Sequence, residues 1–384
     1  MKRTIPSFIE MYAKLINTSS ISSQNPEFDQ SNKKIIELLA EWLEEIGFKI
    51  NIQKVNNNNK KFNLIGKLGS GEGGLLLSGH SDTVNCNEQS WKSDPFKLTI
   101  SNNKFYGLGT VDMKGFFSCI LDLLMEINIK KLKKPIYLLV TADEETSMSG
   151  AKFFLKSSTI SPELIIIGEP TTLTPIIGHK GNITKSIITI GDSGHASNTE
   201  NKINSINIMY ETIFYLLKIQ EKVKNLISQK KFDIPYSTMN FGYIKGGHSS
   251  NTICEFCELH IDIRLLPKLQ YETFNKIFEE HLYPIKKKWK RNIIIKDLHP
   301  PIPSYEIPIQ HKKIIKIVEK ITKRKRKLVS YCSEASFLNK IAPTILLGPG
   351  SIKQAHQPNE FLEILYIKKT KTIIKKIINF ICCS

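Results

Sequence analysis

The fold of this chain is decided by LLLSGHSDT, residues 75–83, in which an apolar run ends at His80 and, two residues later, Asp82. An uninterrupted apolar run is typical of a strand that is buried on both faces of a parallel sheet. Open α/β sheets build their active sites at the carboxyl ends of such strands. His80 and Asp82 project to the same side of an extended segment. One of them can therefore bind a metal ion while the other orients it.

Three later segments place carboxylates in comparable positions. The apolar runs 136–140 and 164–167 are each followed by acidic residues, and GLGTVDMKG, residues 107–115, contains a further aspartate. The acidic residues of these segments are Asp112, Glu144, Glu145 and Glu169. Carboxylates that meet at one sheet edge repel each other and take up protons unless a cation lies among them. The pattern therefore predicts a pair of bound metal ions at this edge.

The donor types favour zinc, which takes histidine nitrogen and carboxylate oxygen in catalytic sites and keeps a position open for water. The candidate ligands are His80, Asp112, Glu145, Glu169 and a late histidine, His356. Asp112 between two metals would leave one histidine and one glutamate for each of them. Side chains of neighbouring residues diverge, so Glu144 stays free to act as a general base that takes a proton from the attacking water and returns it to the leaving amine.

Each of these features also has a purely structural interpretation. A pair of glutamates after a strand is commonly a solvated loop, and Asp112 before a helix could serve only as its N-cap. A histidine at a strand end is often part of the core. The metal hypothesis depends on all of them occurring together at the ends of consecutive strands.

Composition limits the remaining possibilities. The chain has 384 residues, which suggests two domains or one large domain with an insertion. It contains no apolar stretch of about 18 residues, so we expect no membrane span. The first residues, MKRTIP, lack the apolar core of a signal peptide. The 7 cysteines are scattered and odd in number, which is typical of a reducing cytoplasm.

The net charge of +18 raises the possibility of nucleic-acid binding. Lysine dominates over arginine, however, and segments such as 56–61 (NNNNKK) are typical of compositional drift. We find no basic motif interleaved with aromatic residues, so we predict neither a nucleic-acid nor a membrane partner. Cys254 and Cys257 have C-x-x-C spacing without a second pair nearby, which is weak support for a metal or redox site.

The order of the expected elements predicts an α/β fold. Strands and helices alternate through residues 1–178, which favours a mostly parallel sheet covered by helices. Asp29 is a candidate N-cap for the second helix, the segment 56–59 is expected to form a turn between two strands, and Asn102-Asn103 to form a hairpin turn.

The pattern changes after residue 178. In the expected strand 253–265, Leu259, Ile261 and Ile263 alternate with polar residues, which is typical of a sheet with one solvated face. Two β–α–β halves in this region indicate a small α+β sandwich inserted into the larger domain. We therefore predict a catalytic domain formed by residues 1–178 and 292–384, interrupted by an inserted domain at residues 179–291.

Several segments together resemble the dimetal aminoacylase/carboxypeptidase family. The metal-site segments GHSDT, GLGTVDMKG, TADEE and GEP begin at residues 79, 107, 141 and 168. Further similar segments are GHKG, SGHAS, YCSEA, LGPGS and AHQPNE, at residues 178–181, 193–197, 331–335, 347–351 and 355–360. The resemblance covers essentially the whole chain. The segment 198–202 (NTENK) departs from it, because the family usually has a proline and an Arg-Gly pair there.

The resemblance implies roles for particular residues. Two divalent ions, zinc or alternatively cobalt, would be held by the five candidate ligands with Asp112 bridging, and Asp82 would orient His80. The inserted domain would act as a lid and join two copies into a homodimer. His195 of this domain would stabilise the oxyanion, often in the active site of the partner subunit. Arg264 would bind the substrate carboxylate, and Asn251 would contact the substrate.

The function that the resemblance implies is metal-dependent hydrolysis of the acetyl amide of N2-acetyl-L-ornithine, with a sibling activity on N-succinyl-diaminopimelate or dipeptides as the alternative. A basic binding protein with the same fold is the rival from another class, which the complete ligand set disfavours.

Overall fold

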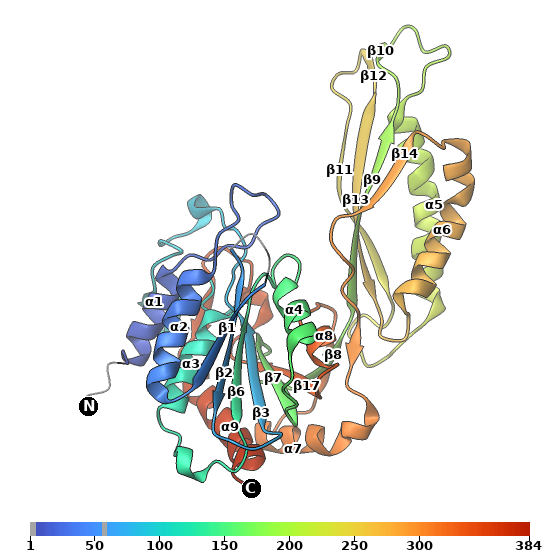
Figure 1. The fold of residues 1–384 in the computed structure, drawn as a ribbon. Helices are drawn as coiled ribbons and strands as arrows, with labels where there is room; N and C mark the ends of the chain where they lie inside the picture. The colour runs from blue at the N-terminus through green and yellow to red at the C-terminus, as the bar shows by residue number, and fades with distance from the viewer. Residues whose placement is uncertain (1–4, 56–59) are drawn as a thin grey trace. The chain divides into compact units, whose positions relative to one another are not determined.

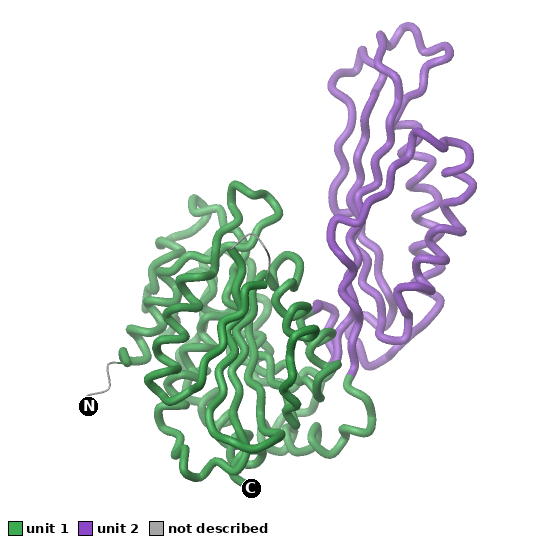
Figure 2. The backbone as a smooth tube through the Cα atoms, in the orientation of Figure 1, with its two compact units in different colours: residues 1–177, 307–327, 333–384 green, residues 178–306, 328–332 purple. Residues whose placement is uncertain are grey.

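The computed structural model describes residues 5–55 and 60–384, and these residues form two compact units (Figure 2). Unit 1 comprises the described residues up to Ile177 together with Ile307–Lys327 and Ser333–Ser384, and unit 2 comprises Gly178–Glu306 and Leu328–Cys332. The turn expected at 56–59 lies outside the described residues. The second unit continues to Glu306 rather than to residue 291, because the strand Ile293–Asp297 pairs with a strand of unit 2.

The sheet of unit 1 confirms the predicted α/β class (Figure 1). Its hydrogen-bonded strand order is β1-β2-β6-β3-β7-β17, and β8 follows β17 on this path. The strands β6, β3, β7 and β17 are parallel, whereas β2 is antiparallel to both β1 and β6. The bounds are β1 (Lys49–Lys54), β2 (Phe62–Leu68), β3 (Leu75–His80), β6 (Ile136–Thr141), β7 (Leu164–Pro170), β8 (Ile176–His179) and β17 (Thr344–Gly348).

Helices cover this sheet on both sides. In Figure 1, α2 and α3 lie on one side, and α4 and α8 lie on the other. Every residue of β3 and β6 is buried, which explains why their sequences are apolar without alternation. The helices of unit 1 are α1 (Phe8–Asn17), α2 (Lys33–Ile46), α3 (Lys114–Leu124), α4 (Ser149–Ser157), α7 (Lys312–Thr322), α8 (Ala335–Leu338) and α9 (Leu365–Cys382).

A small three-stranded sheet in unit 1 has the order β18-β5-β4, with the bounds β4 (Thr99–Ser101), β5 (Lys104–Tyr106) and β18 (Phe361–Glu363). The predicted Asn102-Asn103 turn between β4 and β5 is confirmed, and both asparagines have positive φ, as a two-residue hairpin turn requires. The short strand β16 (Lys327–Val329) pairs with β8, and one-turn 3₁₀ helices lie at Glu88–Ser90, Ile129–Lys131, Ile309–His311 and Ile352–Gln354.

Unit 2 is built on an antiparallel sheet of order β11-β13-β9-β14, against which α5 and α6 pack (Figure 1). Along β13, buried and partly exposed residues alternate as predicted. One face therefore packs against the helices, where Ile187 and Ile261 of the sheet and Phe278 of α6 are buried in the same core. The bounds are β9 (Gly181–Ile190), β10 (Gly194–His195), α5 (Ser205–Leu226), β11 (Thr238–Gly246), β12 (Thr252–Ile253), β13 (Phe256–Leu265), α6 (Tyr271–Lys288), β14 (Ile293–Asp297) and β15 (Tyr305–Glu306).

The start of α2 differs from the prediction. Asn32, not Asp29, occupies the N-cap position, and the Asp29 carboxylate accepts a hydrogen bond from Lys61 Nζ at 2.7 Å. The ion pair satisfies Asp29 three residues before the N-cap Asn32. In the part of the chain that the structure describes, none of the helices is long and apolar enough to cross a membrane.

Candidate metal centre

The candidate ligands lie where the parallel strands of unit 1 end. The register pairs His80 with Thr141 across β3 and β6, and Ile167 lies opposite both Ser78 of β3 and Leu346 of β17. His80 is therefore the last residue of β3, the Glu144–Glu145 pair follows β6, and Glu169 lies near the end of β7. The segment after β17 leads to His356. Strands in parallel register thus bring residues from distant parts of the sequence to one edge.

The two histidines approach different oxygens of Asp112. His80 Nε2 lies 3.1 Å from Asp112 Oδ1, and His356 Nε2 lies 3.4 Å from Asp112 Oδ2. His356 Nε2 is also 3.0 Å from Glu145 Oε2. The metal-ligating atoms of His80, Asp112 and Glu145 all lie within 4.8 Å of one another. Asp112 thus stands between two groups of donors, which is the arrangement that a bridging carboxylate requires.

The hydrogen bonds of His80 fix which of its ring nitrogens can bind a metal. Nδ1 lies 2.9 Å from the main-chain carbonyl of Asp82, which can only accept, so Nδ1 donates and Nε2 faces Asp112. The Asp82 carboxylate is 3.8 Å from the same Nδ1. Asp82 therefore contacts His80 mainly through its carbonyl, whereas the sequence suggested the carboxylate.

The Asp82 carboxylate instead holds the two glutamates that follow β6. It accepts the backbone N–H of Glu144 at 3.2 Å and that of Glu145 at 3.1 Å. Asp82 is 1% exposed, so these bonds form in a medium where they are strong. One buried carboxylate thus places both the candidate base and a candidate ligand.

The turn that carries these glutamates has a second anchor, Asp143, whose φ is +66°. Its carboxylate accepts hydrogen bonds from Thr146 Oγ1 at 2.6 Å, from Ser149 Oγ at 3.1 Å and from Ser147 Oγ. Lys61 is 4% exposed, and its Nζ lies 3.6 Å from Asp143 Oδ1 as well as bonding Asp29. Lys61 is not among the predicted site residues, because nothing in its local sequence indicates a contact with Asp143.

The protonation of the histidines reflects the surrounding carboxylates. Burial alone would lower the pKa of His80, but the hydrogen bond and charge of Asp112 outweigh it, and the pKa is raised well above its ordinary value. Hydrogen bonds to Asp112 and then Glu145 raise the pKa of His356 to about 11. Burial opposes ionisation of Asp112, yet the two histidines hold its pKa well below the ordinary range. Without a metal, protons on the histidines supply the positive charge at this site.

The surroundings favour the neutral, protonated form of the glutamates. Burial, followed by the charge of Asp112, raises the pKa of Glu169 to about 8. Burial is also the main cause of the raised pKa of Glu144 and of Glu145. Carboxyl groups that resist ionisation because other carboxylates surround them are the groups that a divalent cation stabilises in the charged form.

The donor geometry fits bound metal. Ligand atoms about 2.1 Å from one zinc ion at tetrahedral angles lie about 3.4 Å from each other. The nitrogen–oxygen distances of 3.1, 3.4 and 3.0 Å at His80 and His356 match this spacing. In the metal-free protein these are hydrogen bonds from protonated histidines, and a metal ion that replaces the protons would find the same donors at a suitable spacing.

Glu334 is a further buried carboxyl at this edge, in the segment YCSEA to which the sequence assigned no catalytic role. Its Oε2 lies 2.8 Å from Thr141 Oγ1 at the end of β6. It is 1% exposed, and within the described residues its Oε1 has no hydrogen-bond partner. Burial raises the pKa of Glu334 to about 8. The segment YCSEA already contained Glu334, but only the fold places this residue beside Thr141.

The remaining predicted residues belong to unit 2. His195 is exposed at the end of β10, and its Nδ1 lies 2.7 Å from Ser197 Oγ. Asn251 is exposed, and its side-chain oxygen accepts from Ser249 Oγ at 2.7 Å. Arg264 on β13 is half-buried and makes a bidentate ion pair with Asp262, at 2.8 Å from Nε and 3.0 Å from Nη2. The substrate roles of these residues stay predictions.

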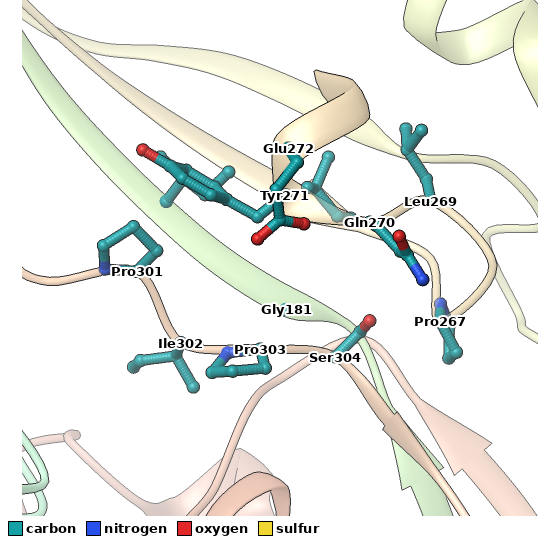
Figure 3. Close-up of a pocket in the computed structure, with 12 residues that line it drawn as sticks. Gly181, Pro267, Leu269, Gln270, Tyr271, Glu272, Pro301, Ile302, Pro303 and Ser304 are labelled. Atoms are coloured by element: carbon teal, nitrogen blue, oxygen red, sulfur yellow. The ribbon is translucent and has the colours of Figure 1, made fainter. Parts of the chain in front are cut away.

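A pocket of about 600 Å³ lies in unit 2 at the start of α6 (Figure 3). Prolines and aliphatic residues form most of its wall, and Figure 3 shows Glu272, Gln270 and Ser304 as polar groups around it. None of the predicted site residues lines it. We therefore do not assign the reaction to this pocket.

Fold and site together define an α/β protein whose carboxylate and histidine donors are suited to divalent metal ions. Residues 76–379 match peptidase family M20/M25/M40. The chain belongs to this family.

Proteins named acetylornithine deacetylase are similar over the full length. The protein from Photorhabdus laumondii is 49% identical over 384 residues, with 100% of both chains covered. The protein from Shigella sonnei is 46% identical over 382 residues, again with 100% of both covered. Among solved structures, a metallo-carboxypeptidase of family M20 from Sulfolobus solfataricus has a TM-score of 0.77 at 17% identity, covering 97% of this chain and 99% of that one. A tripeptidase from Staphylococcus aureus has a TM-score of 0.76 at 18% identity, with 97% of both chains covered.

Proposed function

We propose that this protein hydrolyses the acetyl amide of N2-acetyl-L-ornithine to L-ornithine and acetate, a step of arginine biosynthesis. The observation that carries the proposal is the identity of 46–49% over essentially the whole chain to proteins named for this activity. The donor set at the sheet edge supports it independently, because amide hydrolysis at neutral pH needs an activated water and a stabilised oxyanion.

Two divalent ions, which we propose to be zinc with cobalt as a substitute, supply Lewis-acid chemistry when bound, polarising the amide carbonyl and acidifying a water molecule. His80 and Glu169 would hold one ion, and His356 and Glu145 the other, with Asp112 shared. The distances at Asp112 support the separation of the two histidines, since its two oxygens face different ones, and the 3.0 Å contact of His356 with Glu145 supports pairing those two residues. Oxygen and nitrogen donors select poorly among these metals by affinity, so zinc is proposed on ligand type.

Glu144 is the proposed general base. Asp82 holds its backbone N–H, and its neighbour Glu145 faces His356, so the Glu144 side chain is not needed as a ligand. Burial raises the pKa of Glu144 well above the ordinary value of a glutamate. A carboxylate with a raised pKa takes a proton from the attacking water more readily and can then deliver it to the departing α-amine. Bond cleavage releases acetate and the free amine of ornithine.

The residues of unit 2 are proposed to bind and orient the substrate. His195, whose Nδ1 is occupied by Ser197, has Nε2 available to steady the oxyanion. Arg264 is held by Asp262 along one edge of its guanidinium, and Nη1 on the other edge lies 3.7 Å from Cys332 Sγ. That edge could receive the substrate carboxylate in a bidentate arrangement. Asn251 is proposed as an additional polar contact.

We further propose that the protein is a homodimer joined through unit 2. Along α5, Ile206, Tyr210, Phe214 and Leu217 recur at helical spacing and are 46%, 74%, 52% and 47% exposed. A row of large apolar side chains on one helix face is typical of an interface, and a second copy offers the same row for self-complementary contact.

All described cysteines are free thiols, which supports our proposal of a cytoplasmic protein.

Turnover by the metal-stripped protein, measured as release of a new primary amine from each substrate and of acetate from the acetylated one, tests the function directly. The assay compares N2-acetyl-L-ornithine with N-succinyl-diaminopimelate and a dipeptide, before and after addition of zinc or cobalt. We expect release from acetylornithine only after metal is restored. Metal-dependent turnover of only the succinyl compound or the dipeptide would keep the chemistry and replace the substrate. Salt-sensitive nucleic-acid binding without any turnover would support a binding protein instead.

A further inference from the structure

The carboxylate of Glu360 is buried beside the loop that carries Asp112. It is 1% exposed and accepts three backbone hydrogen bonds from that loop. Its Oε1 accepts the N–H of Val111 at 2.7 Å and that of Asp112 at 3.1 Å, and its Oε2 accepts the N–H of Gly109 at 3.0 Å. A single side chain therefore satisfies most of the N–H groups of residues 109–112.

Other contacts show that this loop depends on distant groups for its shape. Gly109 has a φ of +82°, a conformation that residues with a side chain rarely adopt. The N–H of Gly107 donates to the main-chain carbonyl of Glu360 at 3.2 Å, and Tyr12 donates its hydroxyl to the carbonyl of Thr110 at 2.6 Å. The loop has no regular secondary structure of its own, so these contacts decide where Asp112 lies.

Glu360 also belongs to the segment that carries His356. It lies immediately before β18, which pairs with β5, so that Phe361 is opposite Tyr106. The segments of His356 and Asp112 are thus joined at two adjacent places, by the strand pair and by the Glu360 carboxylate. The distance of 3.4 Å between His356 Nε2 and Asp112 Oδ2 depends on this connection.

We propose that Glu360 is a positioning residue for the metal centre: by holding the amides of Gly109, Val111 and Asp112, it keeps the Asp112 carboxylate where its two oxygens reach His80 and His356 separately. The inference rests on the proposed metal site but not on the identity of the substrate. Removing this hold should let Asp112 turn toward one side, so that two metal ions no longer share it. Groups that orient metal ligands typically change metal affinity about 10- to 100-fold when they are replaced.

Glu360→Gln tests the proposal with almost no change in size. The glutamine amide group would direct its own N–H toward an N–H of the loop, so it could not accept all three backbone hydrogen bonds. We expect the weaker of two cobalt-binding events, measured by titration calorimetry on metal-stripped protein, to lose about 10- to 100-fold in affinity. The visible absorption spectrum of the cobalt-loaded protein should change as well, which a general loss of stability would not produce.

Glu363→Gln is the matched control, because Glu363 lies on β18 in the same segment and pairs with Lys104 rather than with the loop. It should bind both cobalt ions like the unmodified protein. Glu360→Asp keeps the carboxyl group but is one methylene shorter, so it should lose less affinity than Glu360→Gln, and it replaces that variant if the glutamine protein does not fold. Two cobalt ions bound with unchanged affinity and spectrum in either Glu360 variant would overturn the proposal. Absence of metal binding by the unmodified protein would overturn both this inference and the proposed function.

Discussion

The two units of this protein use their sheets in different ways. In unit 1, every residue of β3, β6 and β7 is buried, and the charged groups come only where these strands end. In unit 2, buried and partly exposed residues alternate along β13, and Arg264 and His260 belong to its open face. Groups at strand ends are positioned by main-chain register, whereas charged groups on the open face of β13 are paired with neighbours on the same face, Arg264 with Asp262 and His260 with Glu258.

The sharpest test of this contrast is Glu144→Gln in unit 1. The variant should lose about 100- to 10,000-fold in kcat, the usual contribution of a general base, because the amide cannot accept the proton. Metal content and thermal unfolding should stay unchanged, since Asp82 holds the backbone and not the side chain of residue 144. Acetate release and metal analysis measure the two quantities. Glu163→Gln, an exposed glutamate paired with Lys134, is the control. Near-normal turnover of the Glu144 variant would remove this residue from the role.

His195→Asn asks whether unit 2 takes part in the reaction. If His195 donates to the developing oxyanion, kcat should fall about 100- to 1,000-fold while metal content and KM change little. His248→Asn is the control, because His248 is another exposed histidine of the same unit. Equal kinetics of the two variants would make unit 2 a scaffold without a catalytic group and would widen the contrast between the units.

Phe214→Glu tests the exposed row on α5. A buried interface aromatic commonly contributes about 2 kcal/mol or more to association, so a charge here should raise the dimer dissociation constant more than about tenfold. Sedimentation velocity across a range of protein concentrations measures it, with Glu163→Gln in unit 1 as the control. If the Phe214 variant dimerises like the unmodified protein, the interface does not include this row. If the unmodified protein is itself a monomer, the proposed homodimer is wrong.

The smallest effect concerns the stability of metal-free unit 1 as a function of pH. The pKa of Glu169 is about 8 in the folded protein and near the ordinary value of a glutamate when unfolded, so the folded state binds the extra proton between these values. The contribution of Glu169 to stability is therefore complete at acidic pH and is lost as the pH rises through about 8. His356, with a pKa of about 11, acts in the same direction above the unfolded value of histidine.

Metal-stripped protein should accordingly unfold at progressively lower temperature from pH 5 to pH 8, by a few degrees. Metal-loaded protein should show the opposite trend or none, because bound cations replace the protons. Thermal unfolding with and without chelator measures both. A metal-free protein that becomes more stable toward pH 8 would contradict the electrostatic account of the cluster.

Residue type and position relative to strand ends were enough to predict that His80, Asp112 and Glu145 lie close together, while their role as metal ligands stays a prediction. His80, Glu145 and Glu169 follow apolar runs that can only be buried strands, and parallel strands end at one edge. The supporting contacts could not be predicted in this way. Asp82 binding the amides of Glu144 and Glu145, and Lys61 bonding Asp29 and Asp143, depend on tertiary contacts between segments without any local pattern.

The sheet of unit 2 could also be predicted from the sequence, because the alternation along β13 is a local signal. The end of the unit could not be predicted, since the sequence of β14 is that of any apolar strand, and only its pairing with β9 assigns it to unit 2. Asp29 failed as an N-cap for a similar reason. Its sequence position suits a helix start, but an ion pair with a distant lysine takes its carboxylate.

Unit 1 is discontinuous in sequence, and this has a consequence for biosynthesis. His80, Asp112, Glu145 and Glu169 are synthesised before any of unit 2, whereas His356 and Glu360 are synthesised after all of it. A nascent chain that stops short of β17 holds a cluster of carboxylates with one histidine and no clamp on the Asp112 loop. Tight uptake of two metal ions would then report that the chain has been completed and that both parts of unit 1 have joined.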